Sequence, residues 1–95
     1  RTGSVAIENR GGTDVLVLGA DEEYITYIYH YEGWLMELYI WSGEPMVPEE
    51  GRQLLEAEGL EMSLEGSLLT FKISPAPGVT DTMLLSLRGE EGVDA

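Results

Sequence analysis

One stretch of the chain, residues 23–42, has the alternation of a long β-hairpin. It reads EYITYIYHYEGWLMELYIWS, with Glu32-Gly33 at its centre. If this dipeptide is a two-residue turn, the apolar residues on both sides of it fall on one face. On that face Tyr31 pairs with Trp34, Tyr29 with Met36, Tyr27 with Leu38 and Ile25 with Ile40. A slip of one residue would send one set to the other face, so the pattern and the turn predict the same register.

The opposite face of this hairpin is mixed, as expected for a half-exposed sheet face. It carries Tyr24, Thr26, Ile28 and His30 on the first strand and Leu35, Glu37, Tyr39 and Trp41 on the second. Aromatic rings on a strand can stack on sugars or bind a partner protein, and they also favour strand formation. We interpret the inward rings of Tyr27, Tyr29, Tyr31 and Trp34 as core or core rim. The outward rings of Tyr24, Tyr39 and Trp41 are the candidate binding residues, unless a neighbouring element covers them.

The rest of the chain predicts further strands and one short helix. Strands are expected at residues 4–9 and 14–18, in a second hairpin over residues 60–73, and at residues 82–88. The run DVLVL at residues 14–18 suits a strand covered on both faces. The second hairpin would turn at Glu65-Gly66 and place Leu64 opposite Ser67. In the last strand, Met83, Leu85 and Leu87 would point inward.

The helix is predicted at residues 48–58, PEEGRQLLEAE, where Pro48 opens the segment and Gly59 follows it. Leu54 and Leu55 would pack on the sheet. The Gly- and Pro-containing segments 42–48 and 74–81 are expected to be loops. These elements define a single, mainly β domain over residues 1–95. Its fold would be an antiparallel meander sheet of about seven strands with one short helix near residues 48–58.

The charge of the chain excludes several partners. It has 18 acidic and 5 basic residues, and its net charge is −13. A phosphate backbone would be repelled, so we expect no nucleic-acid binding, and anionic membrane surfaces are disfavoured for the same reason. The acidity serves solubility or attracts a cation or a basic partner.

No signature of catalysis, metal binding or cofactor binding appears in the sequence. Cysteine is absent, which removes disulfides, thiolate nucleophiles and cysteine-ligated metals. His30 is the one histidine, and no serine lies in a Gly-x-Ser-x-Gly elbow. The acid clusters lack the D-x-[DN]-x-[DN]-G pattern of a calcium loop, and the loop at residues 19–22 is the strongest candidate among them for a cation. We therefore expect no enzyme, no cofactor and no metal site.

Four segments of the chain resemble an uncharacterised family of exported, pseudopilin-like (prepilin-type) proteins of Gram-positive gut bacteria. The segments are VLVL, EEYITYIYHYEGWLMELYIW, LLEAEGLEMSLEGSLLTFKIS and TMLLSLRG, which span most of the chain from Val15 to Gly89. The family's tyrosine-rich motif falls on Tyr24, Thr26, Tyr27, Ile28, Tyr29, Tyr31, Glu32, Gly33, Leu35, Glu37 and Leu38.

The resemblance implies a long apolar N-terminal helix that anchors the subunit in the membrane, and a β-sheet headgroup outside it. This chain does not contain that helix and starts at Arg1, which suits a soluble headgroup of a longer, membrane-anchored protein. With the helix counted, the fold would be α+β. The protein would lie at the cell surface or outside the cell, with other pilin-like subunits or a surface protein as partners. The resemblance carries over no catalytic residue.

Two functions follow as expectations. The first is a non-enzymatic structural and recognition headgroup of a pseudopilin-like surface or secretion-system protein. The second is an extracellular binding module, with carbohydrate as one ligand class, that uses Tyr24, Tyr39 and Trp41. A small hydrolase built around His30 is the least favoured reading. We also expect a weak homodimer, unless the short helix covers the apolar face of the sheet.

Overall fold

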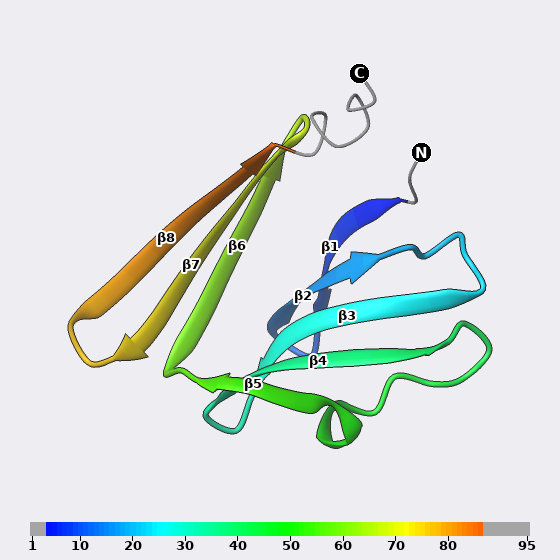
Figure 1. Ribbon diagram of the computed structural model, residues 1–95, viewed down its shortest axis with the longest axis horizontal. Helices are drawn as coiled ribbons and strands as arrows, with labels where there is room; N and C mark the ends of the chain where they lie inside the picture. Colours follow the sequence, from blue (N-terminus) through cyan, green and yellow to red (C-terminus); the bar gives the residue numbers. More distant parts are fainter. Residues whose placement is uncertain (1–3, 87–95) are drawn as a thin grey trace.

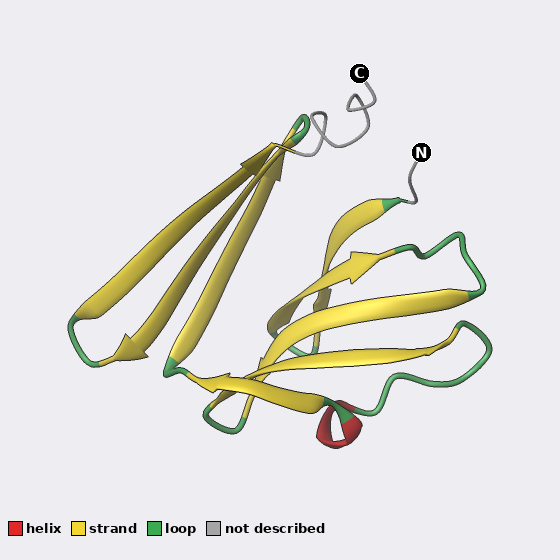
Figure 2. Cartoon of the chain, viewed as in Figure 1, coloured by secondary structure: helices red, strands yellow, loops and turns green. Residues whose placement is uncertain are grey.

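The computed structural model describes residues 4–86, which form two antiparallel sheets (Figures 1 and 2). The first sheet has the order β1-β2-β3-β4-β5, with β1 Val5–Arg10, β2 Thr13–Leu18, β3 Tyr24–Tyr31, β4 Trp34–Trp41 and β5 Arg52–Glu56. The second has the order β6-β7-β8, with β6 Gly59–Glu65, β7 Leu68–Ala76 and β8 Val79–Ser86. The prediction of a mainly β, antiparallel fold is confirmed. Within residues 4–86, however, the strands number eight rather than about seven, and they form two meanders rather than one.

The helix predicted for residues 48–58 is wrong beyond its first turn. Only η1 (Pro48–Glu50) is helical, as a single 3-10 turn, and the backbone is extended from Gly51 onwards. β5 then pairs with β4, because the hydrogen bonds of an open strand edge stabilise an extended segment more than a short helix containing glycine stabilises itself. Leu54 and Leu55 therefore remain 38% and 41% exposed. The described residues include no helix with the length and apolar character of a membrane span.

The central hairpin has the predicted register. Tyr31 lies opposite Trp34 and Ile25 opposite Ile40, and the pairing continues to Tyr24 and Trp41. The two turn residues have positive φ angles, 49° at Glu32 and 87° at Gly33. Both angles are needed by the tight turn that matches the twist of the two strands.

The second hairpin has a different turn from the predicted one. Glu65 belongs to β6 and pairs with Leu68, so the turn is Gly66-Ser67, and Leu64 lies opposite Leu69 instead of Ser67. The shift is two residues, which leaves every side chain on its predicted face. Alternation alone could not separate the two registers.

The loop predicted for residues 74–81 shrinks to the two-residue turn Pro77-Gly78. β7 continues to Ala76, and β8 begins at Val79 rather than residue 82. The ladder shifts register between Ile73 and Ala76, so a proline at position 75 is tolerated in the central strand of this sheet. Met83 lies opposite Phe71, as the inward prediction requires, yet it is 51% exposed. The side chains of Leu85 and Leu87 lie outside the described part of the chain.

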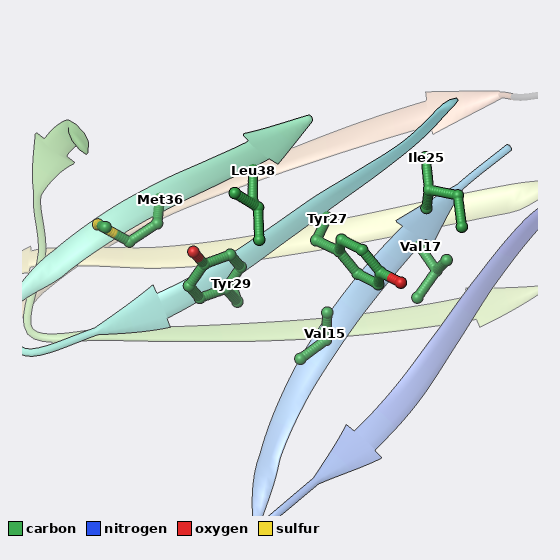
Figure 3. Close-up of a cluster of buried hydrophobic side chains, with 7 residues drawn as sticks. All are labelled: Val15, Val17, Ile25, Tyr27, Tyr29, Met36 and Leu38. Atoms are coloured by element: carbon green, nitrogen blue, oxygen red, sulfur yellow. The ribbon is translucent and has the colours of Figure 1, made fainter. Parts of the chain in front are cut away.

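The core has two parts, one on each face of the five-stranded sheet. The first gathers residues of β2, β3 and β4 (Figure 3), namely Val15, Val17, Ile25, Tyr27, Tyr29, Met36 and Leu38. The second consists of Leu16, Met62 and Leu69 and joins the two sheets. Val15, Leu16 and Val17 are each 2% exposed, which confirms that β2 is covered on both faces.

The junction between the sheets is held by three hydrogen bonds. The Ala57 amide donates to the Gly33 carbonyl (3.0 Å), and the Glu58 amide donates to the Ser74 carbonyl (2.6 Å). The Ala57 carbonyl accepts from His30 Nε2 at 2.7 Å. β6 follows directly and contacts β1, β2 and β3, so the second sheet packs on the first through its own first strand.

Candidate functional site

The three outward rings lie together at the open end of the central hairpin, where β3 begins and β4 ends. Tyr24 is 49% exposed, Tyr39 66% and Trp41 51%. Tyr24 pairs with Trp41, and Tyr39 pairs with the next residue on the same face, Thr26. We call these three residues the aromatic surface. The three-stranded sheet packs around Leu16 on this same face of the five-stranded sheet, but it does not cover the three rings.

Each ring of the aromatic surface is in contact with another ring or with the backbone. Tyr24 and Tyr39 stack, with ring centroids 5.5 Å apart and planes inclined by 22°. The Trp41 indole lies against the backbone of Gly43, where an added Cβ would collide with the ring. The chain turns there because the Glu44 amide donates to the Trp41 carbonyl (2.9 Å). At the end of the strand, the Ser42 amide donates to the Glu23 carbonyl (2.8 Å). The stacked pair and the supported indole need little reordering to meet a flat ligand surface.

A shallow groove continues from the stacked tyrosines towards β1 and β2. Its volume is about 340 Å³, and its lining comes from four segments: Ser4, Val5, Leu18, Gly19, Glu22, Tyr24, Thr26 and Tyr39. Apolar side chains form part of this lining, while Glu22, Thr26 and Ser4 supply a carboxylate and two hydroxyls. The groove therefore combines ring faces for stacking with groups for hydrogen bonding.

The edge of the groove is fixed by Ser4. Its carbonyl accepts from the Gly19 amide (2.8 Å), and its hydroxyl accepts from the Ala20 amide (3.1 Å). The Ser4 amide donates to Asp21 Oδ1 at 3.2 Å. This hydrogen bond is the main reason why the pKa of Asp21 lies below its ordinary value.

The loop at residues 19–22 was the strongest candidate in the sequence for a cation site. Its aspartate accepts a hydrogen bond from the Ser4 amide, so it takes part in folding. Across residues 4–86, no group of three or more histidine, aspartate or glutamate side chains converges as a metal site would require.

His30 lies on the same face of β3 as Tyr24 but serves a different part of the molecule. Its Nε2 donates to the Ala57 carbonyl, which fixes that tautomer and ties the ring to the junction between the sheets. The side chain is therefore part of the packing that joins β3 to the start of the second sheet.

The sequence predicted that the three rings point outward, but it did not predict which residues surround them. Tyr24, Tyr39 and Trp41 could be placed on one face by alternation within a single hairpin. The groove depends on Ser4, Leu18 and Glu22, which only tertiary pairing brings beside the rings. The one sequence signal for this part was the acidic loop at residues 19–22, which includes Gly19 and Glu22 of the groove.

Comparison with known proteins gives a family but no characterised relative. A family model described as Domain of unknown function (DUF4860) matches residues 1–76. This span includes the whole five-stranded sheet, the aromatic surface and the groove. No curated protein and no solved structure matches the chain.

Proposed function

We propose that this chain, which belongs to the family described as Domain of unknown function (DUF4860), is a non-enzymatic recognition headgroup. The observation that carries the proposal is the aromatic surface. Its rings are about half-exposed or more, they are stacked or supported by backbone, and two of them, Tyr24 and Tyr39, line a groove. Exposed tyrosine and tryptophan contribute large contact areas at low entropic cost and are common at the centres of binding surfaces.

The non-enzymatic part of the proposal rests on the use of the polar side chains. His30 is bound to a main-chain carbonyl and Asp21 to a main-chain amide, so both contribute to folding. The groove holds one carboxylate, Glu22, beside hydroxyls and rings, which suits binding by hydrogen bonds and stacking.

The wider setting that we propose follows the resemblance to pseudopilin-like proteins. The headgroup would be carried outside the cell by a membrane-anchored protein, and it would contact other pilin-like subunits or a surface protein. The aromatic surface is then the contact region.

A photo-crosslinking amino acid tests this contact in the full-length protein in its own cells. Placed at Tyr39, it should crosslink to a second pilin-like subunit or a surface protein. Placed at Ser63, which is exposed in β6, it should give no such product. Crosslinks of equal yield at both positions, or none at Tyr24, Tyr39 and Trp41, would contradict the proposal.

Carbohydrate binding is the second candidate, favoured by the hydroxyls and the carboxylate beside the stacked rings. A sugar ring can stack on tyrosine while its hydroxyls bond to groups such as Thr26 and Glu22. Tryptophan fluorescence, titrated with a panel of soluble oligosaccharides, tests it. The Trp41→Ala variant should lose the response and remain folded, whereas Leu84→Ala, a change at a 62% exposed residue of β8, should keep it.

A further inference from the structure

A second pocket lies on the other face of the five-stranded sheet, near the Glu32-Gly33 turn. Its volume is about 450 Å³, which falls within the range of small-ligand sites. The side chains that line it are Tyr31, Glu32, Trp34, Met36, Glu49 and Gln53, with Gly51 adding backbone. None of these residues belongs to the aromatic surface or its groove, so the pocket is independent of the function proposed above.

Two aromatic rings and a thioether form the apolar part of the pocket. Tyr31 and Trp34 are the directly opposed pair that closes the central hairpin. Both are partly buried against the first core cluster, in which Met36 is 3% exposed. The rings are therefore backed by packed side chains but keep access to the pocket.

The charged part of the pocket is entirely acidic. Glu32 and Glu49 contribute carboxylates, and no lysine, arginine or histidine is among the lining residues. Burial of the Tyr31 hydroxyl, followed by the negative charges of Glu32 and Glu49, raises the pKa of Tyr31. Both carboxylates thus act on the same end of the pocket. An anion would be repelled there and a cation attracted.

The acidic rim is held by the core and does not depend on a loose loop. Glu49 lies in η1, and the hydroxyl of the buried Tyr29 donates to the carbonyl of the preceding Pro48 at 2.7 Å. Gly51, directly after η1, packs so closely on the Tyr29 hydroxyl that a Cβ would collide with it. These contacts fix the distance between the Glu49 segment and the hairpin.

The combination of groups selects the kind of cation. A divalent metal needs several converging oxygen ligands, and residues 4–86 provide no cluster of three. An ammonium group with alkyl substituents can use the ring faces through cation–π attraction and the carboxylates through charge. We propose that this pocket binds an alkylammonium group. Its source is either a lysine side chain of a partner protein or a free small-molecule ammonium compound.

Amide-resolved NMR titration of the full chain tests the proposal, with choline as the cationic probe. The matched probe is 3,3-dimethyl-1-butanol, which has the same shape without the charge. Choline should shift the amide signals of Tyr31, Trp34 and Met36, and the neutral analogue should leave them in place. Equal shifts with both probes, or none with choline, would overturn the proposal.

Two conservative variants separate a defined site from general attraction to an acidic protein. Glu49→Gln should raise the Kd for choline about five- to tenfold, because a carboxylate beside the ammonium is lost. Glu50→Gln changes the net charge equally at a neighbouring exposed residue outside the pocket, and it should change the Kd less than about twofold. Trp34→Leu should raise the Kd about three- to thirtyfold through loss of the ring face. Equal effects of Glu49→Gln and Glu50→Gln would overturn the proposal.

A third probe distinguishes the two sources of the ammonium group. N-acetyl-lysine methylamide represents a lysine of a partner protein, and the same compound acetylated on its side chain is the neutral control. Tighter binding of the lysine compound than of choline assigns the pocket to a partner's lysine, and the reverse order assigns it to a free small-molecule ammonium compound. Binding of the acetylated compound as tightly as the charged one would contradict both.

Discussion

Tyr29 joins the first core cluster to the segment that precedes β5. Its ring is 1% exposed, and its hydroxyl donates to the Pro48 carbonyl at 2.7 Å. A buried tyrosine hydroxyl needs such a partner, because an unpaired polar group in the core is costly. The residue thereby positions η1, although the sequence predicts η1 as part of a longer helix.

Tyr29→Phe should lower the free energy of unfolding by about 1 kcal/mol, because the hydrogen bond is lost while the ring still packs. Urea denaturation followed by circular dichroism near neutral pH measures this change. Tyr39→Phe is the control, since Tyr39 is 66% exposed and should change stability by less than about 0.5 kcal/mol. Equal effects of the two variants would show that the Pro48 contact contributes nothing.

The same hydroxyl should make stability sensitive to alkaline pH. Burial, assisted by the nearby carboxylates of Glu49 and Glu50, raises the pKa of Tyr29 above its ordinary value of about 10. Below about pH 10, the pKa of tyrosine in the unfolded chain, both the folded and the unfolded chain keep the Tyr29 proton. The contribution of the Tyr29 hydroxyl to stability is then fully present. As the pH rises further, the unfolded chain releases the proton first, and stability falls until the folded pKa is passed. The loss of stability above about pH 10 should therefore be shallower in Tyr29→Phe than in the parent chain.

Tyr31→Phe provides the comparison for this titration. The pKa of Tyr31 is also raised, so its removal should reduce the alkaline slope as well, and the double variant should reduce it most. Urea denaturation series from neutral to alkaline pH measure the slopes. Parallel pH profiles for the parent and all three variants would contradict the assignment.

Gly51 and Tyr29 are expected to be energetically coupled. A Cβ at position 51 would collide with the Tyr29 hydroxyl and would lie 3.1 Å from the Glu37 carbonyl oxygen. Gly51→Ala should therefore cost about 1–3 kcal/mol. In a Tyr29→Phe background the first collision disappears, so the cost of Gly51→Ala should fall by about 0.5 kcal/mol or more. A double-mutant cycle measures this coupling, and strictly additive effects would contradict the packing described.

Among the elements, the hairpins show what local pattern can and cannot determine. The central hairpin was predictable because its long apolar alternation and its Glu-Gly turn agree on a single register. The second hairpin has the same dipeptide, Glu65-Gly66, but turns one residue later. Two registers that differ by two residues bury the same faces, so only the choice of turn residues separates them. β5 was missed for another reason: its extended form is stabilised by pairing with β4, which is distant in the sequence.

The two Glu-Gly dipeptides should respond differently to the same substitution. Glu32 has φ 49°, a left-handed conformation that asparagine tolerates better than glutamate. Glu32→Asn should therefore stabilise the chain by roughly 0.5–1 kcal/mol. Glu65 lies in β6, where asparagine is a poorer strand former, so Glu65→Asn should be neutral or destabilising. Thermal unfolding of both variants measures this, and equal stabilisation would show that residue 65 also takes a left-handed turn position.

In the molecule as a whole, the two sheets differ in how their apolar residues are covered. The five-stranded sheet has its own cluster of seven buried residues, while the cluster that joins the sheets has three. This division could not be predicted, because alternation along a strand indicates which face is apolar but not which element covers that face. The same limit applies to the aromatic surface. The sequence predicted that its rings point outward, but their exposure depends on where the three-stranded sheet packs.

The small joining cluster should make the three-stranded sheet the first part to open. Leu69 is 2% exposed and shares the joining cluster with Met62 of its own sheet and Leu16 of the five-stranded sheet. Leu69→Ala should lower global stability by about 2–5 kcal/mol, because it leaves a cavity at the only buried cluster shared by the sheets within residues 4–86. Hydrogen exchange should show a lower opening free energy in β6 and β7 than in β3 and β4, both in the parent chain and in Leu69→Ala. Leu84→Ala removes the same side chain at a 62% exposed position and should leave both sheets unchanged. Equal opening free energies across all strands of both sheets would instead mean that the two sheets unfold as one cooperative unit.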